Sequence, residues 1–296
     1  MVEIQAYTRI TLALDIVRRI PDGPLAGYHE IAAVKHQTTL HDTVRVDDAR
    51  QSSVRCDPAD GVPQDETNVC MRAVRLLQKR CGAGREAAVS IAKRIPVMGG
   101  LAGGSADAAA TITALCRLWG LSLSRAEMLA LGRELGMDVP YFFVGGTALD
   151  REAAGEPSPV TTSLSLDFVL VVPRFGVPTR EAYAGLDYRL VNRNARLTAA
   201  MVEALGAGDR AGVARSVHND FAATVYGRYP GLARLEKALL EQGCDAAWMS
   251  GSGSTMVGLA RDQAHARRVA AVLGADPEAT RVLCSRTLTA GSGLTE

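Results

Sequence analysis

The sequence predicts an α+β protein of two domains that meet near residue 155. The chain has 296 residues, more than the ~100–200 residues of an average single domain. Segments with the alternation of strands and segments with the periodicity of helices follow one another along the chain. Residues 150–163 (DREAAGEPSPVTTS) form a polar segment with Pro and Gly between two such halves. We therefore expect one domain over residues 1–155 and another over residues 156–296.

The composition is that of an ordinary globular protein. Hydrophobic residues make up 47% of the chain and charged residues 22%, so a core can form. Lys plus Arg total 33 and Asp plus Glu total 32, which lacks the positive excess typical of nucleic-acid binding. No apolar run approaches the ~18 residues of a membrane span, and Glu3 stands where a signal peptide would be basic. We expect a cytoplasmic monomer or homodimer that acts on a small molecule, not on nucleic acid or membrane.

The first ~50 residues predict short strands. The alternating runs are residues 2–7, 10–17, 29–36 and 43–46. The segment 21–24 (PDGP) predicts a turn, because Pro presets φ and Gly admits positive φ. The polar residues 47–61 predict a further hairpin or loop.

Helices follow in the rest of this half. One is expected to begin near Thr67 and to end before Gly82, and a strand is expected over residues 87–95. After a glycine-rich loop, a long helix should precede a second one that starts with the capping box Ser124-x-x-Glu127 and stops at Gly136.

Asp138 is expected on a turn that is open to a cleft. Pro140 disfavours helical backbone angles at Val139, so the chain should leave the helix here. The residues alone favour a plainer interpretation, an aspartate that satisfies backbone donors of its own turn.

The second half begins with a strand over residues 168–172 and continues with helices around residues 198–205, 211–217 and 231–240. Asn219 and Asp220 should initiate another helix. Residues 246–260 predict a strand, a second glycine loop and another strand. A helix over residues 262–273 and a strand over residues 281–287 complete the pattern.

The loop with Gly99, Gly100, Gly103 and Gly104 is the most informative segment. Residues without Cβ let the backbone approach a ligand and point several amides the same way. Ser105 is expected to cap the following helix, whose N-terminal dipole also favours phosphate. The loop lacks both the Walker A and the Rossmann patterns. A glycine-rich turn that serves tight helix packing is the alternative.

Several segments carry a family resemblance. Residues 96–110 resemble the phosphate-binding motif of the galactokinase, homoserine, mevalonate and phosphomevalonate (GHMP) kinase superfamily, and residues 248–258 resemble its C-terminal glycine motif. Within the superfamily, the chain is similar to the family of 4-diphosphocytidyl-2-C-methyl-D-erythritol kinases of the non-mevalonate isoprenoid pathway. The matching segments are residues 27–30 (GYHE), Asn68 with 72–73 (RA), 118–121 (LWGL), 135–142 (LGMDVPYF), 219–221 (NDF) and 250–253 (SGSG).

The resemblance implies a two-domain GHMP kinase fold with a cleft between the domains. The N-terminal domain would be ribosomal protein S5 domain 2-like and the C-terminal domain a ferredoxin-like split βαβ unit. It implies transfer of phosphate from ATP with Mg²⁺ to an alcohol, with Asp138 as the catalytic aspartate and Ser105 as a metal contact that competes with its capping role. The implied ATP-binding residues are Pro96, Val97, Met98, Gly99, Gly100, Leu101, Ala102, Gly103, Gly104, Ser105, Ala106 and Asn68.

The same resemblance assigns the acceptor side of the cleft. Tyr28 and His29 match residues that bind a cytidine ring, and Tyr183 stands where an aromatic residue stacks on it. The second glycine loop would shape the cleft through Gly251, Ser252 and Gly253. Taken alone, His29 and Tyr183 are equally consistent with structural roles.

Two departures from the family pattern keep the acceptor open. The first motif of the family reads Ala-Lys-x-Asn-Leu, whereas this chain has Arg9 and Thr11 in place of the Lys and Asn. Arginine stabilises negative charge but cannot act as a base, so Arg9 is a catalytic candidate of altered character. Residues 24–26 (PLA) are extra, beside the proposed cytidine contacts. The alternatives are another polyol, sugar or cyclitol acceptor, and a non-catalytic nucleotide-binding relative.

Overall fold

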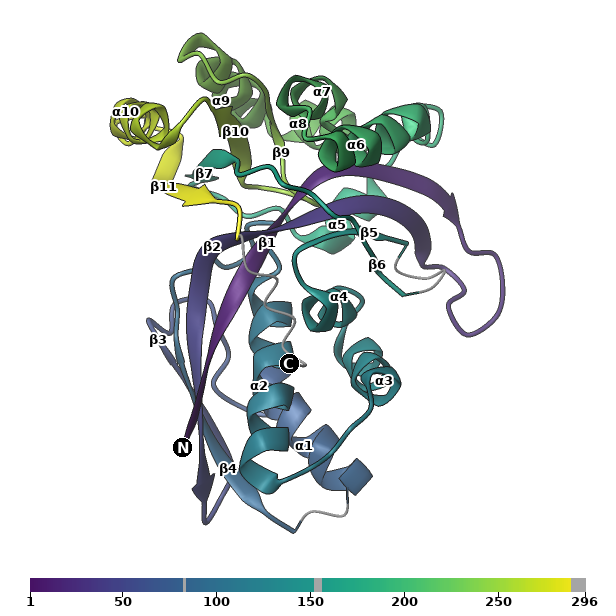
Figure 1. The fold of residues 1–296 in the computed structure, drawn as a ribbon, viewed down its shortest axis with the longest axis vertical. Coiled ribbons are helices and arrows are strands. Elements are labelled where there is room, and N and C mark those ends of the chain that lie inside the picture. Colours follow the sequence, from purple (N-terminus) through teal and green to yellow (C-terminus); the bar gives the residue numbers. More distant parts are fainter. Residues whose placement is uncertain (82–83, 152–155, 289–296) are drawn as a thin grey trace.

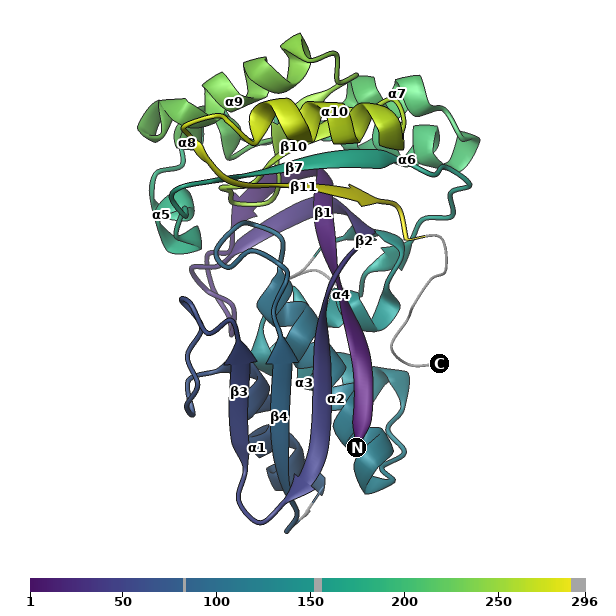
Figure 2. The ribbon, with the colours of Figure 1, turned by 90° about the vertical axis from the view of Figure 1, so that its left-hand side faces the viewer.

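Two β-sheets with helices packed on them make up the structure (Figures 1 and 2). It is a computed structural model that describes residues 1–81, 84–151 and 156–288. The first sheet has the order β3-β4-β2-β1-β8, with β5 paired to both β2 and β6, and the second has the order β11-β7-β10-β9. The strands are β1 Val2–Arg19, β2 His29–Ala49, β3 Ser53–Asp57, β4 Glu86–Ala92, β5 Thr147–Asp150, β6 Ser158–Pro159, β7 Asp167–Pro173, β8 His218–Asn219, β9 Ala247–Met249, β10 Met256–Ala260 and β11 Ala279–Arg286.

Helices cover one face of the first sheet, where α2 lies against β1 and β2 and contacts both α1 and α3 (Figure 2). None of the helices in the described ranges is long and apolar enough to cross a membrane. The helices are α1 Val69–Cys81, α2 Gly103–Trp119, α3 Arg125–Leu135, α4 Val139–Val144, α5 Thr179–Ala184, α6 Ala195–Ala207, α7 Arg210–Ser216, α8 Ala222–Arg228, α9 Pro230–Glu241 and α10 Gln263–Leu273.

Strands β1 and β2 are longer than the sequence predicts. The expected short runs join into two continuous strands of 18 and 21 residues. Irregularities between Tyr7 and Arg9 and between Thr11 and Ala13 shift the pairing and break the alternation in the sequence. Residues 8–16 are all buried, because protein packs against both faces of this part of β1.

The second sheet has the predicted ferredoxin-like topology. Its antiparallel order β11-β7-β10-β9 places the first and third strands in the centre, with α9 before β9 and α10 before β11. Apolar residues of β1 and β2, among them Leu14 and Ile31, share a buried cluster with Val169 and Val171 of β7. The two sheets therefore share a core. The boundary at residue 155 stays a proposal, and residues 152–155 lie outside the described ranges.

Local signals had mixed outcomes. Ser124 and Glu127 form the predicted capping box at the start of α3, which ends before Gly136. The expected non-helical backbone at Val139 is wrong, because α4 begins there. Pro140 falls in the first helical turn, where its missing amide costs no hydrogen bond. Helix α5 was not predicted, and α8 begins at Ala222, later than the predicted start at Asn219 and Asp220. Gly82 lies outside the described residues.

The capping box gives a stability prediction. Replacing Ser124 with Ala removes the acceptor for the Glu127 amide and should lower the free energy of unfolding by about 1 kcal/mol. Urea unfolding measures this change. Ser122→Ala, two residues earlier on an exposed position, is the matched control and should leave stability unchanged. Equal effects of both substitutions would contradict the capping role.

Candidate active site

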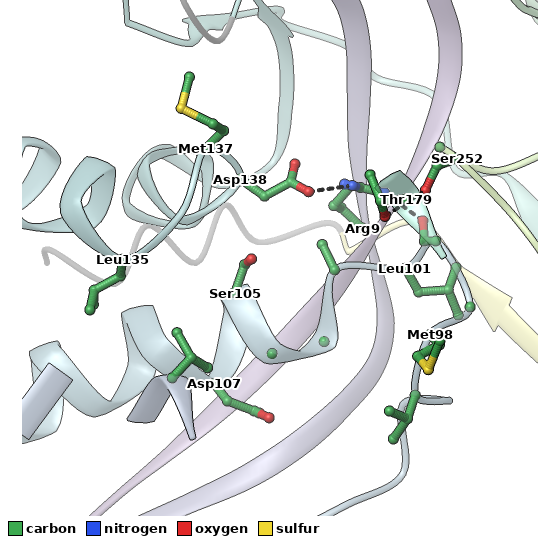
Figure 3. Close-up of a pocket in the computed structure, with 18 of the residues that line it drawn as sticks. Arg9, Met98, Leu101, Ser105, Asp107, Leu135, Met137, Asp138, Thr179 and Ser252 are labelled. Atoms are coloured by element: carbon green, nitrogen blue, oxygen red, sulfur yellow. Dashed lines mark hydrogen bonds and ion pairs between the residues drawn. The ribbon is translucent and has the colours of Figure 1, made fainter. Parts of the chain in front are cut away.

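A cavity of about 1130 Å³ gathers the predicted site residues. One face of β1 and β2 lines it together with the glycine loop, the start of α2, the turn before α4, and the second glycine loop (Figure 3). Every residue predicted to act in catalysis, ATP binding or acceptor binding lines this cavity, except Ala106 and Gly253. Ala106 is buried inside α2. The volume is sufficient for two substrates side by side.

Carbonyl groups of the first glycine loop are tied to the rest of the protein. The Gly99 carbonyl accepts a hydrogen bond from the Thr255 amide at 3.1 Å. The Gly100 carbonyl accepts from Arg9 Nη1 at 2.7 Å and from Ser250 Oγ at 3.1 Å, and the Leu101 carbonyl accepts from the Thr8 hydroxyl.

The amides of this loop have the opposite situation. Within the described part of the chain, the amides of Gly100 and Leu101 donate to no protein group. A peptide unit with an anchored carbonyl and an unbound amide is suited to an anionic ligand.

Close packing between the two glycine loops explains why Gly100 is glycine. A Cβ at Gly100 would lie 2.2 Å from the Ser250 carbonyl oxygen, and the backbone there has φ +71°. A Cβ at Gly251 would lie 3.1 Å from the Gly100 carbonyl oxygen. The alternative role, tight helix packing, applies to Gly103, where a Cβ would meet the Ile95 side chain at 2.8 Å. Close packing between the loops and close packing of α2 therefore both require glycine in this segment.

Ser105 does not cap α2, contrary to the sequence prediction. Helix α2 begins at Gly103, and its N-cap residue is Ala102, which has a left-handed backbone and no capping side chain. Ser105 is the third helical residue, so it lies too far along the helix to cap it. Its hydroxyl has no hydrogen bond to another described residue. In Figure 3, Ser105 faces Asp138 across the cavity.

Asp138 lies between two cations. One carboxylate oxygen accepts from Arg9 Nη2 at 2.7 Å, and the other accepts from Lys35 Nζ at 2.6 Å. The Asp138 side chain is 26% exposed, so it also reaches the cavity. Asp138 is on a turn, as the sequence predicts, but its carboxylate binds side chains of β1 and β2 and makes no hydrogen bond to the amides of α4. The plain turn interpretation therefore does not describe it.

The electrostatic environment keeps Asp138 ionised. Burial by itself would raise the pKa of this carboxyl. The charges and hydrogen bonds of Arg9 and Lys35 outweigh burial and hold the pKa of Asp138 well below its usual range. Asp138 can therefore orient a hydroxyl group over a wide pH range but holds a proton poorly.

Lys35 is a site residue that was not predicted from the sequence. It lines the cavity, is 1% exposed, and also donates to Asp150 at 2.7 Å. A signal for it was present, because Lys35 ends the otherwise apolar run Ile31–Val34, and buried lysines are rare unless paired.

A second ionic cluster lies at the start of the first glycine loop. Lys93 pairs with Asp107 at 2.7 Å and with Asp42 at 2.5 Å. Asp42 also accepts from the amide of Ile95, just before the loop, at 2.9 Å. Burial raises the pKa of Asp107 to about 7, against the opposing charge of Lys93. Asp107 points away from Asp138 in Figure 3, so the cluster acts on the loop and not on the acceptor side.

Aromatic side chains form one end of the cavity. His29 stacks on Tyr183 with ring centroids 4.5 Å apart, and its Nε2 lies 2.6 Å from the Tyr188 hydroxyl. Tyr28 is 55% exposed. The extra residues 24–26 form part of the β1–β2 connection, and Ala26 lines the cavity. Tyr188 was not predicted, and no sequence pattern marks it.

The remaining predicted residues have clear structural partners. Asn68 accepts from the Cys70 amide at 2.8 Å at the start of α1 and donates to the Pro63 carbonyl at 2.6 Å. The Thr11 amide donates to Ser250 Oγ at 3.2 Å. The Ser252 hydroxyl lies 3.0 Å from the Thr179 hydroxyl. Asn68, Thr11 and Ser252 nevertheless border the cavity.

The residues fit a metal ion only in a limited way. No group of three or more His, Cys, Asp or Glu side chains within the described ranges could hold a metal by itself. The Ser105 hydroxyl is a suitable oxygen ligand, whereas both oxygens of Asp138 are engaged by cations. Mg²⁺ commonly binds to few protein ligands when phosphates and waters supply the rest. The donors present therefore fit a magnesium ion that arrives with phosphate groups.

Family models match both halves of the chain. The model of the GHMP kinases N terminal domain matches residues 68–146, and the model of the GHMP kinases C terminal domain matches residues 201–278.

Curated relatives extend over nearly the full length. A 4-diphosphocytidyl-2-C-methyl-D-erythritol kinase of Gloeobacter violaceus is 36% identical over 288 residues, which cover 96% of this chain and 93% of the relative. The kinase of the same name from Pelotomaculum thermopropionicum is 38% identical over 268 residues, which cover 90% and 91%.

Solved structures of kinases are also similar to this chain over nearly its full length. A 4-(cytidine 5'-diphospho)-2C-methyl-D-erythritol kinase superposes with a TM-score of 0.79 and 28% identity over 96% of this chain and 98% of that one. A homoserine kinase from Cytophaga hutchinsonii has a TM-score of 0.74 at 18% identity over 97% and 96%, a likeness of fold alone.

The contact between the glycine loops gives a second prediction. Gly100→Ala should lower the free energy of unfolding by about 1–3 kcal/mol, because the new Cβ meets backbone and the positive φ becomes strained. It should also weaken the binding of a nonhydrolysable ATP analogue, measured by calorimetry. Gly206→Ala in α6, where a Cβ meets nothing within 4 Å, is the control and should stabilise by about 0.5–1 kcal/mol. Unchanged stability and binding in Gly100→Ala would refute the packing role.

Proposed function

This chain belongs to the GHMP kinase family, and on that premise we propose that it phosphorylates an alcohol with ATP. The acceptor we propose is the 2-hydroxyl of 4-diphosphocytidyl-2-C-methyl-D-erythritol. The observation that carries the proposal is the position of Asp138, an ionised carboxylate that reaches the same cavity as the unbound amides of the glycine loop. The curated relatives of that name, 36–38% identical, support this acceptor.

In the proposed reaction, the acceptor oxygen forms a bond to the γ-phosphorus of ATP. The bond from the γ-phosphorus to the β,γ-bridging oxygen breaks, and ADP leaves with that electron pair. The hydroxyl proton passes to solvent as the phosphate ester forms. Such transfers require mainly positioning and charge stabilisation from a protein.

ATP would lie along the first glycine loop. The loop from Pro96 to Ala102 and the first turn of α2, Gly103 to Ala106, would surround its phosphates, with Asn68 on the adjoining wall. A magnesium ion bound by the phosphates and the Ser105 hydroxyl would offset the negative charge of the triphosphate. The helix dipole of α2 adds to this field.

The acceptor would lie between Asp138 and the aromatic end of the cavity. Asp138 orients the attacking hydroxyl, and the guanidinium of Arg9 stabilises the negative charge that develops beside it. Tyr28, His29 and Tyr183 would bind the cytidine ring, which requires the His29 ring to move from the face of Tyr183. Thr11 and the second glycine loop, through Gly251, Ser252 and Gly253, shape the remaining wall.

A different acceptor is the second candidate. Arg9 and Thr11 differ from the residues usual in the family motif, and Ala26 brings the inserted residues 24–26 to the cavity wall. All three differences lie in the part of the cavity proposed for the acceptor. They would therefore favour a different alcohol there, such as another polyol, a sugar or a cyclitol. A non-catalytic nucleotide-binding relative is the remaining alternative. The cytoplasmic location and the oligomeric state stay predictions.

Measurements of turnover distinguish these functions. ADP release is followed with ATP, Mg²⁺ and the cytidylyl substrate, and then with a panel of polyols and sugars. We expect the cytidylyl substrate to give the highest kcat/KM, because the aromatic residues can stack on its base. A polyol that is turned over more efficiently would replace the proposed acceptor, and no transfer to any alcohol would reject the kinase.

Asp138→Asn tests the proposed reaction centre. The amide keeps the size of the side chain but loses its negative charge, so we expect kcat to fall roughly 10²–10⁴-fold. Asp187→Asn is the control, because Asp187 pairs with Arg189 at 2.7 Å and does not line the cavity. Unfolding curves of both variants show whether the buried cations left by Asp138→Asn destabilise the protein. A well-folded Asp138→Asn variant with unchanged kcat would contradict the assignment.

A further inference from the structure

Lys35 is a charged residue that is almost fully buried. It is 1% exposed, and it follows four apolar residues of β2. Burying an unpaired ammonium costs several kcal/mol, so such a residue requires partners. Two carboxylates are among its partners, Asp138 at 2.6 Å and Asp150 at 2.7 Å.

The strand register places these charges on one face of the sheet. Thr11 of β1 pairs directly with Lys35, and Arg9 pairs with Gln37 two residues further along β2. On the other side of β2, Asp150 of β5 pairs with Ala33. Because strand residues two apart share a face, Arg9, Lys35 and Asp150 project to the same side.

Among the described residues, four charged groups meet at this place. Arg9 and Lys35 are positive, and Asp138 and Asp150 are negative. Asp150 is 1% exposed and does not line the cavity, and it accepts a hydrogen bond from Lys35. Its negative charge offsets the charge of Lys35 and so lowers the cost of burying a second cation beside Asp138.

This chain has lost the lysine of the first family motif and has Arg9 in its place. Arg9 is anchored through Nη1 to the Gly100 carbonyl and through Nη2 to Asp138, which fixes its fork. The ammonium of Lys35 approaches the other oxygen of Asp138 from the neighbouring strand. An ammonium group therefore remains at the reaction centre, although it comes from β2.

We propose that Lys35 is a positioning residue for phosphoryl transfer, which orients Asp138 together with Arg9 and is itself held in place by Asp150. This inference rests on the proposed kinase function. Among the described residues, the titratable and charged groups around Asp138 are Arg9 on β1, Lys35 on β2, Asp150 on β5 and Tyr141 on α4. Burial raises the pKa of Tyr141, so this group stays neutral.

Lys35→Met is the principal test. It removes the charge and leaves an unbranched apolar side chain of similar length. We expect kcat to fall by roughly 10²-fold, as for loss of a positioned charge, while KM for ATP changes little. Removal of a nearby positive charge should raise the pKa of Asp138 by about 1–3 units, so the acidic limb of the kcat profile moves to higher pH. The pKa of Asp138 is also read directly by carbon NMR of labelled aspartate carboxyls.

Two further variants separate positioning from stability. Val34→Ala alters the neighbouring residue, which is buried on the opposite face of β2, and should lower stability without moving the pKa of Asp138. Lys35→Met/Asp150→Asn removes both charges of the buried pair, so the fold is retained if Lys35→Met alone unfolds. We expect the double variant to keep the raised pKa and the lowered kcat.

The outcomes are distinct. An unchanged pKa of Asp138 in folded Lys35→Met or in the double variant overturns the proposal, as does an equal loss of kcat in Val34→Ala. If the wild-type protein phosphorylates no alcohol, the proposed kinase function fails. The carboxyl titration still decides whether Lys35 controls Asp138 in that case.

Discussion

A half-buried carboxylate held by two buried cations is the interaction on which the site depends. Asp138 comes from a turn between two helices, whereas Arg9 and Lys35 come from neighbouring strands of the first sheet. None of these groups could be buried alone, because the unpaired charge would cost several kcal/mol. The ion pairs therefore fix the turn relative to the sheet and, through the Arg9 contact with Gly100, fix both relative to the glycine loop.

The second glycine loop completes this arrangement from the other sheet. Ser250 contacts the Gly100 carbonyl and the Thr11 amide, and Asn219 donates to the carbonyls of Met249 and Gly251 at 2.7 Å each. The cavity is consequently built from both sheets and not from one domain alone. A shift of either sheet would separate the amides of the first loop from the carboxylate that faces them.

Sequence patterns predicted the parts of this structure that depend on local chemistry. The capping box at Ser124, the two glycine loops and the turn at Asp138 each follow from the conformational preferences of a few adjacent residues. Patterns failed where long-range packing decides. Bulges hid the continuity of β1, and the position of Ser105 in α2 followed from the left-handed backbone at Ala102. The apolar run before Lys35 marks it as unusual, but no local pattern identifies its partners, which lie 103 and 115 residues away.

The position of bound nucleotide can be measured in a crystal structure of the protein with a nonhydrolysable ATP analogue and Mg²⁺. We expect the phosphates to lie against the amides of Gly100 and Leu101, with the terminal phosphate between Ser105 and Asp138. A nucleotide bound elsewhere, or a glycine loop whose amides are covered by the protein's own groups in the complex, would contradict this expectation.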